Sequence, residues 1–462
     1  MRAHDPGAPR VLDGRGCATD YAALLLSSLG VRVQRTFLQP DIAPDLAWAR
    51  SGAMALTGYS GSDSDAESEG APQLFPAPLA ACVDGVRAAL CALAGQDVTL
   101  PDARTLGERA ALSGLRRNGA ISPGAACHLL PAADGWLAVN LPRAEDWQLT
   151  AAWLEIEGSP LADGSWDELA RLLTNQPVAR LCARGALLGL AVAALQPEES
   201  AVPPWFRVVM QGTPHTPPAD AQRTSPPWVV DLSALWAGPL CTHLLQQLGM
   251  RVIKVESRQR PDGARHGPAA FYDLLNQGKA SVAFDFSDVR EIEWLRALLR
   301  RADIVIESSR PRALRQLGID AEELVASTPG LTWLAISGYG RTAEHENRIA
   351  YGDDAGVAGG LSALLLKQTG APMFCGDAIA DPLTGWHAAL AALASYQGGG
   401  GQLIALALRD VVAHAAAQPM PVEREPISPG QIAEPQARQA QAVARPLGAD
   451  TARILAELGV TC

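Results

Sequence analysis

The stretch "WVVDLSALWAGPLCTHLLQQLGMRVIKVE", residues 228–256, holds two apolar runs separated by a segment of helical periodicity. The first run, Val229–Leu232, and the last, Arg251–Val255, have the length and the β-branched content of buried strands. A Gly-Pro pair precedes the helical segment, and Gly249 follows it at the position where a helix end favours glycine. The stretch therefore predicts a strand, a helix and a second strand in one βαβ unit.

Two further apolar runs follow, "ADIVIESS" (302–309) and "LTWLAISG" (331–338), with helical text such as "REIEWLRALLRR" before them. Regular alternation of strands and helices is typical of a parallel sheet covered by helices on both faces. We therefore predict an α/β fold with a Rossmann-like, mostly parallel sheet. The first turn, "SALWAGP", has one glycine where a dinucleotide site needs G-x-G-x-x-G, which argues against NAD binding.

An internal repeat is visible in the first quarter of the chain. "CVDGVRAALCALA" (82–94) matches "PLTGWHAALAALA" (382–394) at seven of 13 positions, at an offset of 300 residues. "LLSSLGVRV" (25–33) matches "LLQQLGMRV" (244–252) at an offset of 219. Alanine-rich helices match by chance, but two matches in the same order indicate a duplicated α/β unit whose first copy is shorter.

The text between and after these copies completes the predicted organisation. "CHLLPAADGWLAVNL" reads as two short strands around an Ala-Asp-Gly turn, within a small α+β domain. Pro-rich text precedes the second copy, and Pro-, Gln- and Ala-rich text follows it. We predict a degenerate partial large-domain copy (1–105), a small α+β domain (106–200), a Pro-rich linker (201–227), a large domain (228–418) and an extended C-terminal arm with a short helix (419–462).

Composition excludes several classes of function. The 462 residues include 38 Lys+Arg against 49 Asp+Glu, so no overall basic charge points to nucleic acid. The longest apolar run, "ALLGLAVAAL", is far shorter than the ~20 residues of a membrane-spanning helix. The N-terminal text lacks the apolar core of a secretory signal, so we expect a cytoplasmic protein without a membrane partner. Eight scattered cysteines without CxxC spacing predict free thiols and no metal site.

Asp381 stands in "GDAIADPLTGWHAALAALAS", directly before a proline and an alanine-rich helical run. Asp before Pro is a common helix start, with the carboxylate as N-cap. The alternative is a reactive carboxylate held at the helix N-terminus. At the offset of 300 residues, the position of Asp381 corresponds to Ala81 in the first copy. The first copy therefore has the same helix without the acid. Backbone donors for such a site are expected from the glycine-rich text "AGVAGG" (355–360).

The blocks from residue 231 to residue 393 resemble the class III CoA-transferase family, the group of formyl-CoA transferase and carnitine CoA-transferase. The blocks, in order, are "DLS...AGP.C", "LGMRVIKVE", "NQGKASVAFDF", "ESSRPRALRQLGID", "ISGYG" and "AD..TG...A...LAAL". "ADGW" is similar to the family's small domain, and "PLGADTARILAELG" to its C-terminal ending. The resemblance implies a Rossmann-like large domain with a smaller α+β domain, in interlocked dimers. A partly duplicated chain is then expected as a homodimer or as a pseudo-dimeric monomer.

The resemblance also implies the chemistry. Asp381 occupies the place of the family's nucleophile, which attacks an acyl-CoA thioester to give a mixed anhydride and then an aspartyl-CoA thioester. Coenzyme A is a substrate, so the expected partners are an acyl-CoA and a carboxylic acid, and no tightly bound cofactor is implied. Positions that match CoA contacts of the family are Arg258, Asn276, Lys279, Ser309 and Tyr351. A solvated turn or surface loop explains the first three almost equally well, and a buried core residue explains Tyr351.

The sequence departs from the family at four positions near these contacts, which are Ser257, Ser308, Gln316 and Gly352. Two alternative functions therefore stay open. An acyl-CoA racemase is disfavoured, because related racemases have a histidine acid/base where this chain has Tyr351. A catalytically weak CoA-binding partner subunit fits the altered contact positions, but the retained Asp381 favours a transferase.

Overall fold

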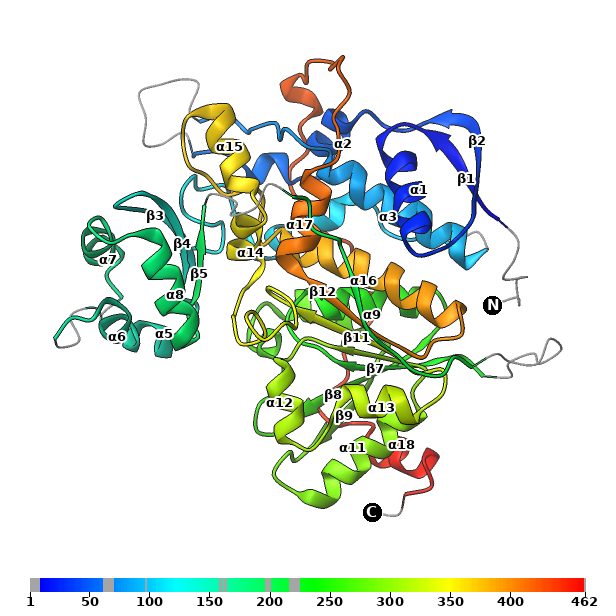
Figure 1. Ribbon diagram of the computed structural model, residues 1–462. Coiled ribbons are helices and arrows are strands. Elements are labelled where there is room, and N and C mark those ends of the chain that lie inside the picture. The colour runs from blue at the N-terminus through cyan, green and yellow to red at the C-terminus, as the bar shows by residue number, and fades with distance from the viewer. Residues whose placement is uncertain are drawn as a thin grey trace.

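A computed structural model describes residues 9–60, 70–95, 98–157, 161, 164–195, 201–215 and 225–460. The large sheet lies at the centre of the molecule, with the N-terminal unit on one side of it and a smaller sheet domain beside both (Figure 1). Within the described residues, no helix has both the length and the apolar character required to cross a bilayer.

The large sheet has seven strands in the order β6-β12-β11-β10-β7-β8-β9. Every neighbouring pair is parallel except β12 and β6. This confirms the predicted α/β fold with a mostly parallel sheet. The bounds are β6 Arg207–Gln211, β7 Trp228–Leu232, β8 Arg251–Ser257, β9 Ala280–Phe284, β10 Ile304–Glu307, β11 Thr332–Ser337 and β12 Gln402–Ala407.

Helices cover both faces of this sheet, because side chains alternate along each buried strand. On β10, Ile304 and Ile306 pack into one apolar cluster with α9 and α16, whereas Val305 packs into another with α11, α13 and α18. The helices of the first face are α9 Ala237–Gln247, α10 Ala269–Asn276, α16 Ala380–Gln397 and α17 Leu408–Ala416; those of the second face are α11 Val289–Arg301, α12 Pro311–Gln316, α13 Ala321–Ser327 and α18 Thr451–Glu457.

The N-terminal unit repeats this construction on a small scale. Strands β1 (Arg10–Arg15) and β2 (Val33–Pro40) are parallel and are joined by α1 (Cys17–Ser28). Leu12 pairs with Arg35 in this sheet, and Asp231 pairs with Lys254 in the large sheet, so the two registers agree at the offset of 219 residues. Two short helices, α2 (Pro44–Arg50) and η1 (Met54–Leu56), complete the unit before α3 (Leu79–Ala94).

The two long helices of the repeat, α3 and α16, also have equivalent close contacts. A Cβ added at Gly85 would lie 2.6 Å from the Ala18 carbonyl oxygen of α1. A Cβ added at Gly385 would lie 2.7 Å from the Ala237 carbonyl oxygen of α9. Both glycines therefore allow a helix backbone to approach closely. The α3 and α16 helices contact each other as well (Figure 1).

The small domain has a three-stranded antiparallel sheet in the order β3-β4-β5. Its first two strands form the hairpin predicted around the Ala-Asp-Gly turn. One face of the sheet packs with α14 (Gly352–Ala358) and α15 (Leu361–Thr369) of the large domain. The bounds are β3 Cys127–Ala132, β4 Gly135–Asn140, β5 Ala191–Ala194, α5 Ala144–Gln148, α6 Thr150–Leu154, α7 Trp166–Leu173 and α8 Val178–Leu188.

The segments predicted as linker and arm differ from each other. Part of the range 201–227 is a strand, β6, which pairs with β12 at the edge of the large sheet, so the linker prediction was wrong there. An exposed edge strand lacks the apolar alternation that identifies buried strands, and residues 216–224 lie outside the described ranges. The C-terminal arm is extended from about residue 419, apart from the short η4 (Pro429–Gln431), and ends in α18 as expected.

Candidate active site

Asp381 lies in the first turn of α16 and is partly buried. The helix begins at Ala380 with Ile379 before it, so the N-cap interpretation of Asp381 was wrong. Ala378 has a positive φ of 42°, and its carbonyl oxygen accepts the Asp381 N–H at 2.9 Å, which starts the helix early. The Asp381 carboxylate accepts a hydrogen bond from the Ala237 N–H, at the first residue of α9. Two helix N-termini therefore meet at this carboxylate.

Two further carboxylates belong to the same cluster. Asp377 is fully buried in the turn before α16. Asp353, in the first turn of α14, accepts the Ala378 N–H at 2.8 Å. Gly352 touches the cluster, because a Cβ at this position would lie 2.4 Å from Oδ2 of Asp381. A larger side chain at Gly352 would need the carboxylate of Asp381 to move.

Arg109 supplies the positive charge of the cluster. It belongs to α4 (Glu108–Ser113), which follows η2 (Ala103–Gly107). Its Nε donates to Oδ2 of Asp377 at 2.9 Å, and its Nη2 donates to the other carboxylate oxygen. The guanidinium carbon also lies 5.8 Å from the centre of the Trp236 ring, next to the start of α9. Arg109 thus joins the segment before β3 to the site of Asp381.

The electrostatic balance of the cluster places Asp381 near half ionisation at neutral pH. Burial raises the pKa of Asp381 to about 7, and the charges of Asp353 and Asp377 act in the same direction. Arg109 and the Ala237 N–H oppose that rise. Burial and the Asp377 charge likewise raise the pKa of Asp353 to about 6, against the effect of Arg109. Perturbed carboxyl groups of this kind are typical of functional sites.

The small domain approaches the cluster through Asn140. Its amide nitrogen donates to Oδ1 of Asp354 at 2.9 Å, and the same oxygen accepts the Tyr351 N–H at 2.9 Å. Burial raises the pKa of Asp354 to about 7. Tyr351 is partly buried at the N-terminal end of α14, one residue before Gly352, and burial raises the pKa of its phenol. Of the predicted CoA contacts, Tyr351 is the one that lies beside the cluster.

The predicted glycine-rich loop "AGVAGG" does not provide backbone donors. Its first four residues belong to α14, and the Ala355 N–H donates to the carbonyl oxygen of Tyr351. The Gly359 and Gly360 N–H groups bond to carbonyl oxygens of the same helix. The acid-and-glycine sequence "GDDAGVA" folds as a helix because Asp354 bonds to the backbone at its start. The N-terminus of α9 supplies the donor instead.

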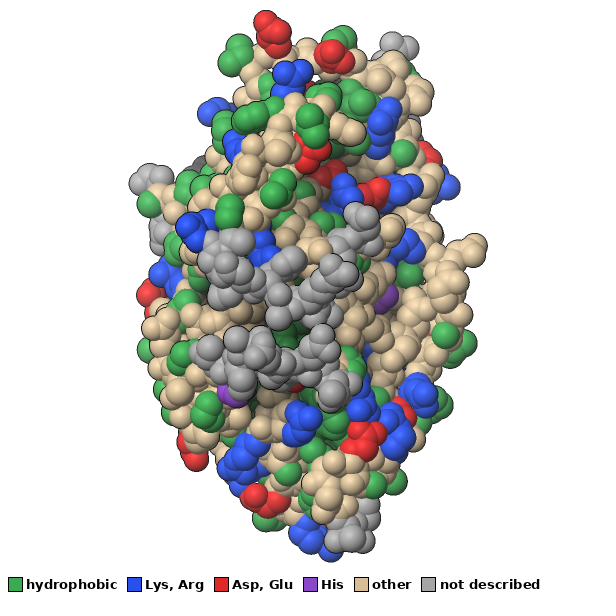
Figure 2. Space-filling model, turned by 90° about the vertical axis from the view of Figure 1, so that its right-hand side faces the viewer, with side chains coloured by type: hydrophobic (Ala, Val, Ile, Leu, Met, Phe, Trp, Pro, Cys, Tyr) green, Lys and Arg blue, Asp and Glu red, His purple; other side chains and the backbone are tan. Residues whose placement is uncertain are grey.

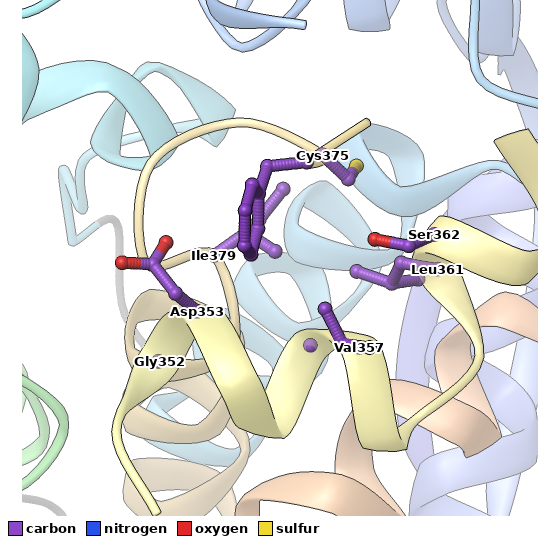
Figure 3. A pocket seen from close by; sticks show the side chains of 9 residues that line it. Gly352, Asp353, Val357, Leu361, Ser362, Cys375 and Ile379 are labelled. Atoms are coloured by element: carbon purple, nitrogen blue, oxygen red, sulfur yellow. The ribbon is translucent and has the colours of Figure 1, made fainter. Parts of the chain in front are cut away.

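A narrow, mainly apolar hollow adjoins the cluster. Figure 3 shows Asp353 at one end and Ser362 at the other, with Val357 below and Ile379 and Cys375 on the opposite wall. The Ser362 hydroxyl is buried without a partner among the described residues. Gly352, which lines this hollow, also touches Asp381, so the hollow and the carboxylate are neighbours.

Asn276, at the end of α10, and Lys279, just before the edge strand β9, are both buried. The Lys279 ammonium lies 3.1 Å from Asp231, 2.7 Å from the Thr242 hydroxyl and 3.1 Å from the Asn276 amide oxygen. The Asn276 amide nitrogen donates to the carbonyl oxygen of Tyr272. Burial lowers the pKa of Lys279 to about 8, although Asp231 opposes this. Both side chains already have internal partners, which favours a structural role and does not support their predicted contact with CoA.

Arg258 and Ser309 lie at the carboxyl edge of the large sheet, after β8 and β10. Arg258 pairs with Glu291 and donates to the carbonyl oxygen of Ala283 at 3.1 Å. The Ser309 hydroxyl donates to Glu307 at 3.1 Å. The start of α9 follows β7 at the same edge, where ligands of parallel α/β sheets bind. The structure thus places both residues on the ligand side of the sheet but gives them protein partners.

No group of His, Cys, Asp and Glu in the described ranges is arranged to hold a metal ion. The cysteines of those ranges are free thiols. On the face shown in Figure 2, Lys and Arg side chains are interspersed with Asp and Glu and form no single basic patch.

Comparison with known proteins identifies the second part of the chain. Residues 228–449 match the sequence model of CoA-transferase family III. This part of the chain belongs to that family. The match contains Asp381, the other two carboxylates of the cluster and the start of α9, whereas Arg109 lies before it.

Three curated relatives show the same family. The succinate–glutarate CoA-transferase of Agrobacterium fabrum is 32% identical over 200 residues, which cover 40% of this chain and 50% of the relative. The succinyl-CoA–D-citramalate CoA-transferase of Chloroflexus aurantiacus is 30% identical over 40% of this chain and 48% of the relative. A formyl-CoA:oxalate CoA-transferase of Escherichia coli is 29% identical over 40% and 47%. The chain spans about half the length of the curated CoA-transferases it matches.

Solved structures similar to the chain include Rv3272 from Mycobacterium tuberculosis. That likeness has a TM-score of 0.38 and 26% identity, and covers 42% of this chain and 55% of the other. A CAIB/BAIF family protein from Brucella suis has a TM-score of 0.35 and 28% identity, with the same coverage.

Sequence reasoning found Asp381 but missed its charged neighbours. Asp377 stands four residues before Asp381 in "GDAIADPL", and this pair of acids was a readable signal. Arg109, in "GERAALSG", has no such signal, because its contact with Asp377 spans 268 residues. The Ala237 N–H reaches Asp381 because the N-termini of α9 and α16 meet, and only the tertiary structure shows that they do.

Proposed function

We propose that the protein transfers coenzyme A from an acyl-CoA thioester to a carboxylic acid, with Asp381 as the nucleophile. One observation carries this proposal: a family III region holds an accessible carboxylate between two helix N-termini, poised near half ionisation at neutral pH. A carboxylate needs to be ionised, close to its target and partly removed from water to act as a nucleophile. The environment of Asp381 provides partial ionisation at neutral pH and partial removal from water.

In the proposed reaction, one Asp381 oxygen attacks the thioester carbonyl carbon, the C–S bond breaks and CoA leaves as the thiolate. The mixed anhydride is then attacked by that thiolate at the Asp381 carbonyl carbon, which forms an aspartyl-CoA thioester and releases the first acid. An acceptor carboxylate reverses these two steps and regenerates the Asp381 carboxylate. The Ala237 N–H and the positive ends of α9 and α16 stabilise negative charge on the Asp381 oxygens.

The names of the relatives support a small carboxylic acid as acceptor. They name succinate with glutarate, succinyl-CoA with D-citramalate, and formyl-CoA with oxalate. The acids named differ in length and substitution, so this chain's own acyl group and acceptor are a separate question. We propose a carboxylic acid as the acceptor class and no narrower identity.

Intact-protein mass spectrometry tests the proposal directly. The protein is incubated with formyl-CoA, acetyl-CoA and succinyl-CoA, each alone, and the Asp381→Asn variant is the control. We expect a hydroxylamine-sensitive CoA adduct on the parent protein and none on the variant. Equal adducts on both proteins, or turnover that survives in the variant, would contradict a nucleophilic role for Asp381.

A CoA-binding subunit without catalysis is the second candidate. The internal partners of Lys279 and Asn276, together with the ion pair of Arg258, speak against a complete transferase site and so favour a subunit without catalysis. The same incubation separates the two functions, because such a subunit would bind CoA thioesters and form no adduct with any of them.

We also propose that residues 1–105 are a shortened copy of the large domain, and that the chain is a pseudo-dimeric monomer. The equal register of the two parallel strand pairs and the equivalent glycine contacts of α3 and α16 support this reading. Tyr21 of the first unit also donates to, or accepts from, His387 of α16 at 2.7 Å in a buried contact. Light scattering of the full chain would then give the mass of one 48.5 kDa chain, and a mass of two chains would contradict the proposal.

A further inference from the structure

We propose that Arg109 is a positioning residue that keeps the Asp381 carboxylate ionised for attack. The inference rests on the proposed function of Asp381 and adds to it a residue from outside the family-matched region. Arg109 acts on the nucleophile through charge and does not itself touch the thioester.

The side chain of Arg109 is held in place from both sides. Two donors of its guanidinium bond to the two oxygens of Asp377, which fixes the plane of the group. Its helix is anchored by the neighbouring Glu108, whose Oε2 accepts from Nη2 of Arg438 in the C-terminal arm at 2.9 Å. These contacts place the positive charge beside the carboxylate cluster.

The charges around Asp381 show why this arginine is needed. Asp353 faces the site from α14, Asp377 from the turn before α16, and the Ala237 N–H from α9. Arg109, bonded to Asp377 of this cluster, is a cation whose charge acts on Asp381. With Arg109 present, its charge offsets one of the three carboxylates. Without it, three neighbouring carboxylates would repel one another, and the proton would stay on Asp381 at neutral pH. A protonated carboxyl group is not a nucleophile.

The origin of Arg109 gives the N-terminal half of the chain a role in the reaction. Asp353, Asp377 and Asp381 all lie in the region that matches the family, whereas α4 lies before that region and before β3, the first strand of the three-stranded sheet. The first half therefore contributes a charge to the site as well as a packing surface. A fragment limited to residues 228–449 would keep the nucleophile and lose the group that holds it ionised.

The kinetic test compares pH profiles of kcat/KM for succinyl-CoA, or for whichever of the three thioesters gives the adduct. Arg109→Met is combined with Asp377→Asn, so that no buried carboxylate is left unpaired, and the double variant is compared with Asp377→Asn alone, so that the two proteins differ only at residue 109. We expect the acid limb of the double variant to lie about one pH unit above that of Asp377→Asn, which is a loss of up to about tenfold on the acid side that disappears at pH 9. Arg104→Met, at an exposed ion pair five residues upstream, is the matched control and should leave the limb unchanged. A loss of the same size at every pH would overturn the proposal.

Single substitutions at the pair sharpen the result. Asp377→Asn alone removes an anion and should move the limb down, which is the opposite direction. Arg109→Lys keeps the charge and should leave the limb near its parent position, even where turnover falls. Movement of both variants in the upward direction would contradict control by charge.

A second measurement does not depend on activity. The unfolding free energy of Asp381→Asn is compared with that of its parent as a function of pH, in the Asp377→Asn background and in the Arg109→Met/Asp377→Asn background. The pH at which this difference levels off reports the pKa of Asp381 in the folded state. We expect it to lie about one pH unit higher without Arg109. Equal values would refute the role of Arg109 whether or not a CoA adduct forms, whereas a missing adduct with shifted values would refute only the proposed reaction.

Discussion

In the N-terminal unit α1 packs on α3, and in the second unit α9 packs on α16. Both pairs have a glycine at the crossing point, Gly85 and Gly385. In both units the first helix joins two parallel strands, and the two strand pairs have the same register. The helix starts differ, because α3 has the buried Ala81 where α16 has Asp381. The comparison shows that the acid is not required to form or pack the helix. Its presence in α16 is therefore better explained by chemistry than by stability.

The strands of the two units differ in the same sense. Leu12 of β1 is buried and apolar, whereas the equivalent Asp231 of β7 is a buried carboxylate between Lys254 and Lys279. The charges of these lysines and hydrogen bonds from Ser233 and Thr242 hold the pKa of Asp231 low, despite burial. The second unit thus has a buried polar network where the first has an ordinary apolar core. Asp381 and the network around Asp231 therefore both lie in the second unit.

The largest expected effect separates the two helix starts. Asp381→Asn should lower turnover by roughly 10³-fold or more, because it removes the nucleophile while the helix keeps its shape. Ala81→Ser, at the equivalent position of α3, should leave turnover unchanged. The measurement is steady-state transfer between the thioester that gives the adduct and a panel of carboxylic acids. Comparable losses in the two variants would show that these positions matter only for packing.

The next effect concerns the buried network that the first unit lacks. Lys279→Met should lower the free energy of unfolding by about 3 to 5 kcal/mol, because it leaves Asp231 buried without its nearest cation. Asp231→Leu combined with Lys279→Met gives β7 an apolar residue like Leu12 of β1. This double variant should recover much of the lost unfolding free energy. Urea unfolding followed by circular dichroism measures both.

The same variants address the role of Lys279 in CoA binding. If the double variant is stable and binds CoA as tightly as the parent by isothermal titration calorimetry, Lys279 is structural. A stable double variant with strongly weakened CoA binding would restore the CoA contact predicted from the sequence.

A smaller pair of effects tests the glycine crossings. Gly85→Ala and Gly385→Ala should each lower the free energy of unfolding by roughly 1 to 3 kcal/mol, because each new Cβ would overlap a carbonyl oxygen of the facing helix. Gly385→Ala should also reduce turnover, since it displaces Ala237, whose N–H bonds to Asp381. Gly85→Ala should not. A stability loss in only one of the two would weaken the case for a repeated unit.

Local patterns in the sequence predicted the parts of the fold that local physics controls. The strand, helix and strand of residues 228–256 and the hairpin of the small domain are confirmed, because apolar runs and turn residues specify them. The strand β6 was missed, because an edge strand with exposed side chains has no apolar pattern that separates it from the neighbouring loop sequence. The loop predicted at "AGVAGG" was wrong, because the contacts of Asp354 with the backbone at the start of α14 outweigh the glycines.

The sequence predicted the central residue of the candidate site, Asp381, but not the contacts around it. Asp381 follows from its motif, and Asp377 from its spacing four residues earlier. The Arg109 contact joins segments 268 residues apart and depends on how the two units pack together. The electrostatic environment of Asp381 therefore depends on the tertiary structure, and the sequence alone does not reveal it.

The smallest effect concerns stability against pH. The folded pKa of Asp381, about 7, lies above its unfolded value near 3.9, so the folded state holds the proton more tightly and its stability falls as pH rises between these values. Asp381→Asn should then stabilise the protein by roughly 1 to 2 kcal/mol at pH 8 and by almost nothing at pH 4, after allowance for the partial exposure of the side chain. Glu344→Gln, at an exposed site, should show no such pH dependence. The equivalent position in α3 is Ala81, which has no charge. A gain in unfolding free energy confined to high pH would mean that the ionised Asp381 carboxylate destabilises α16, a cost that α3 does not have.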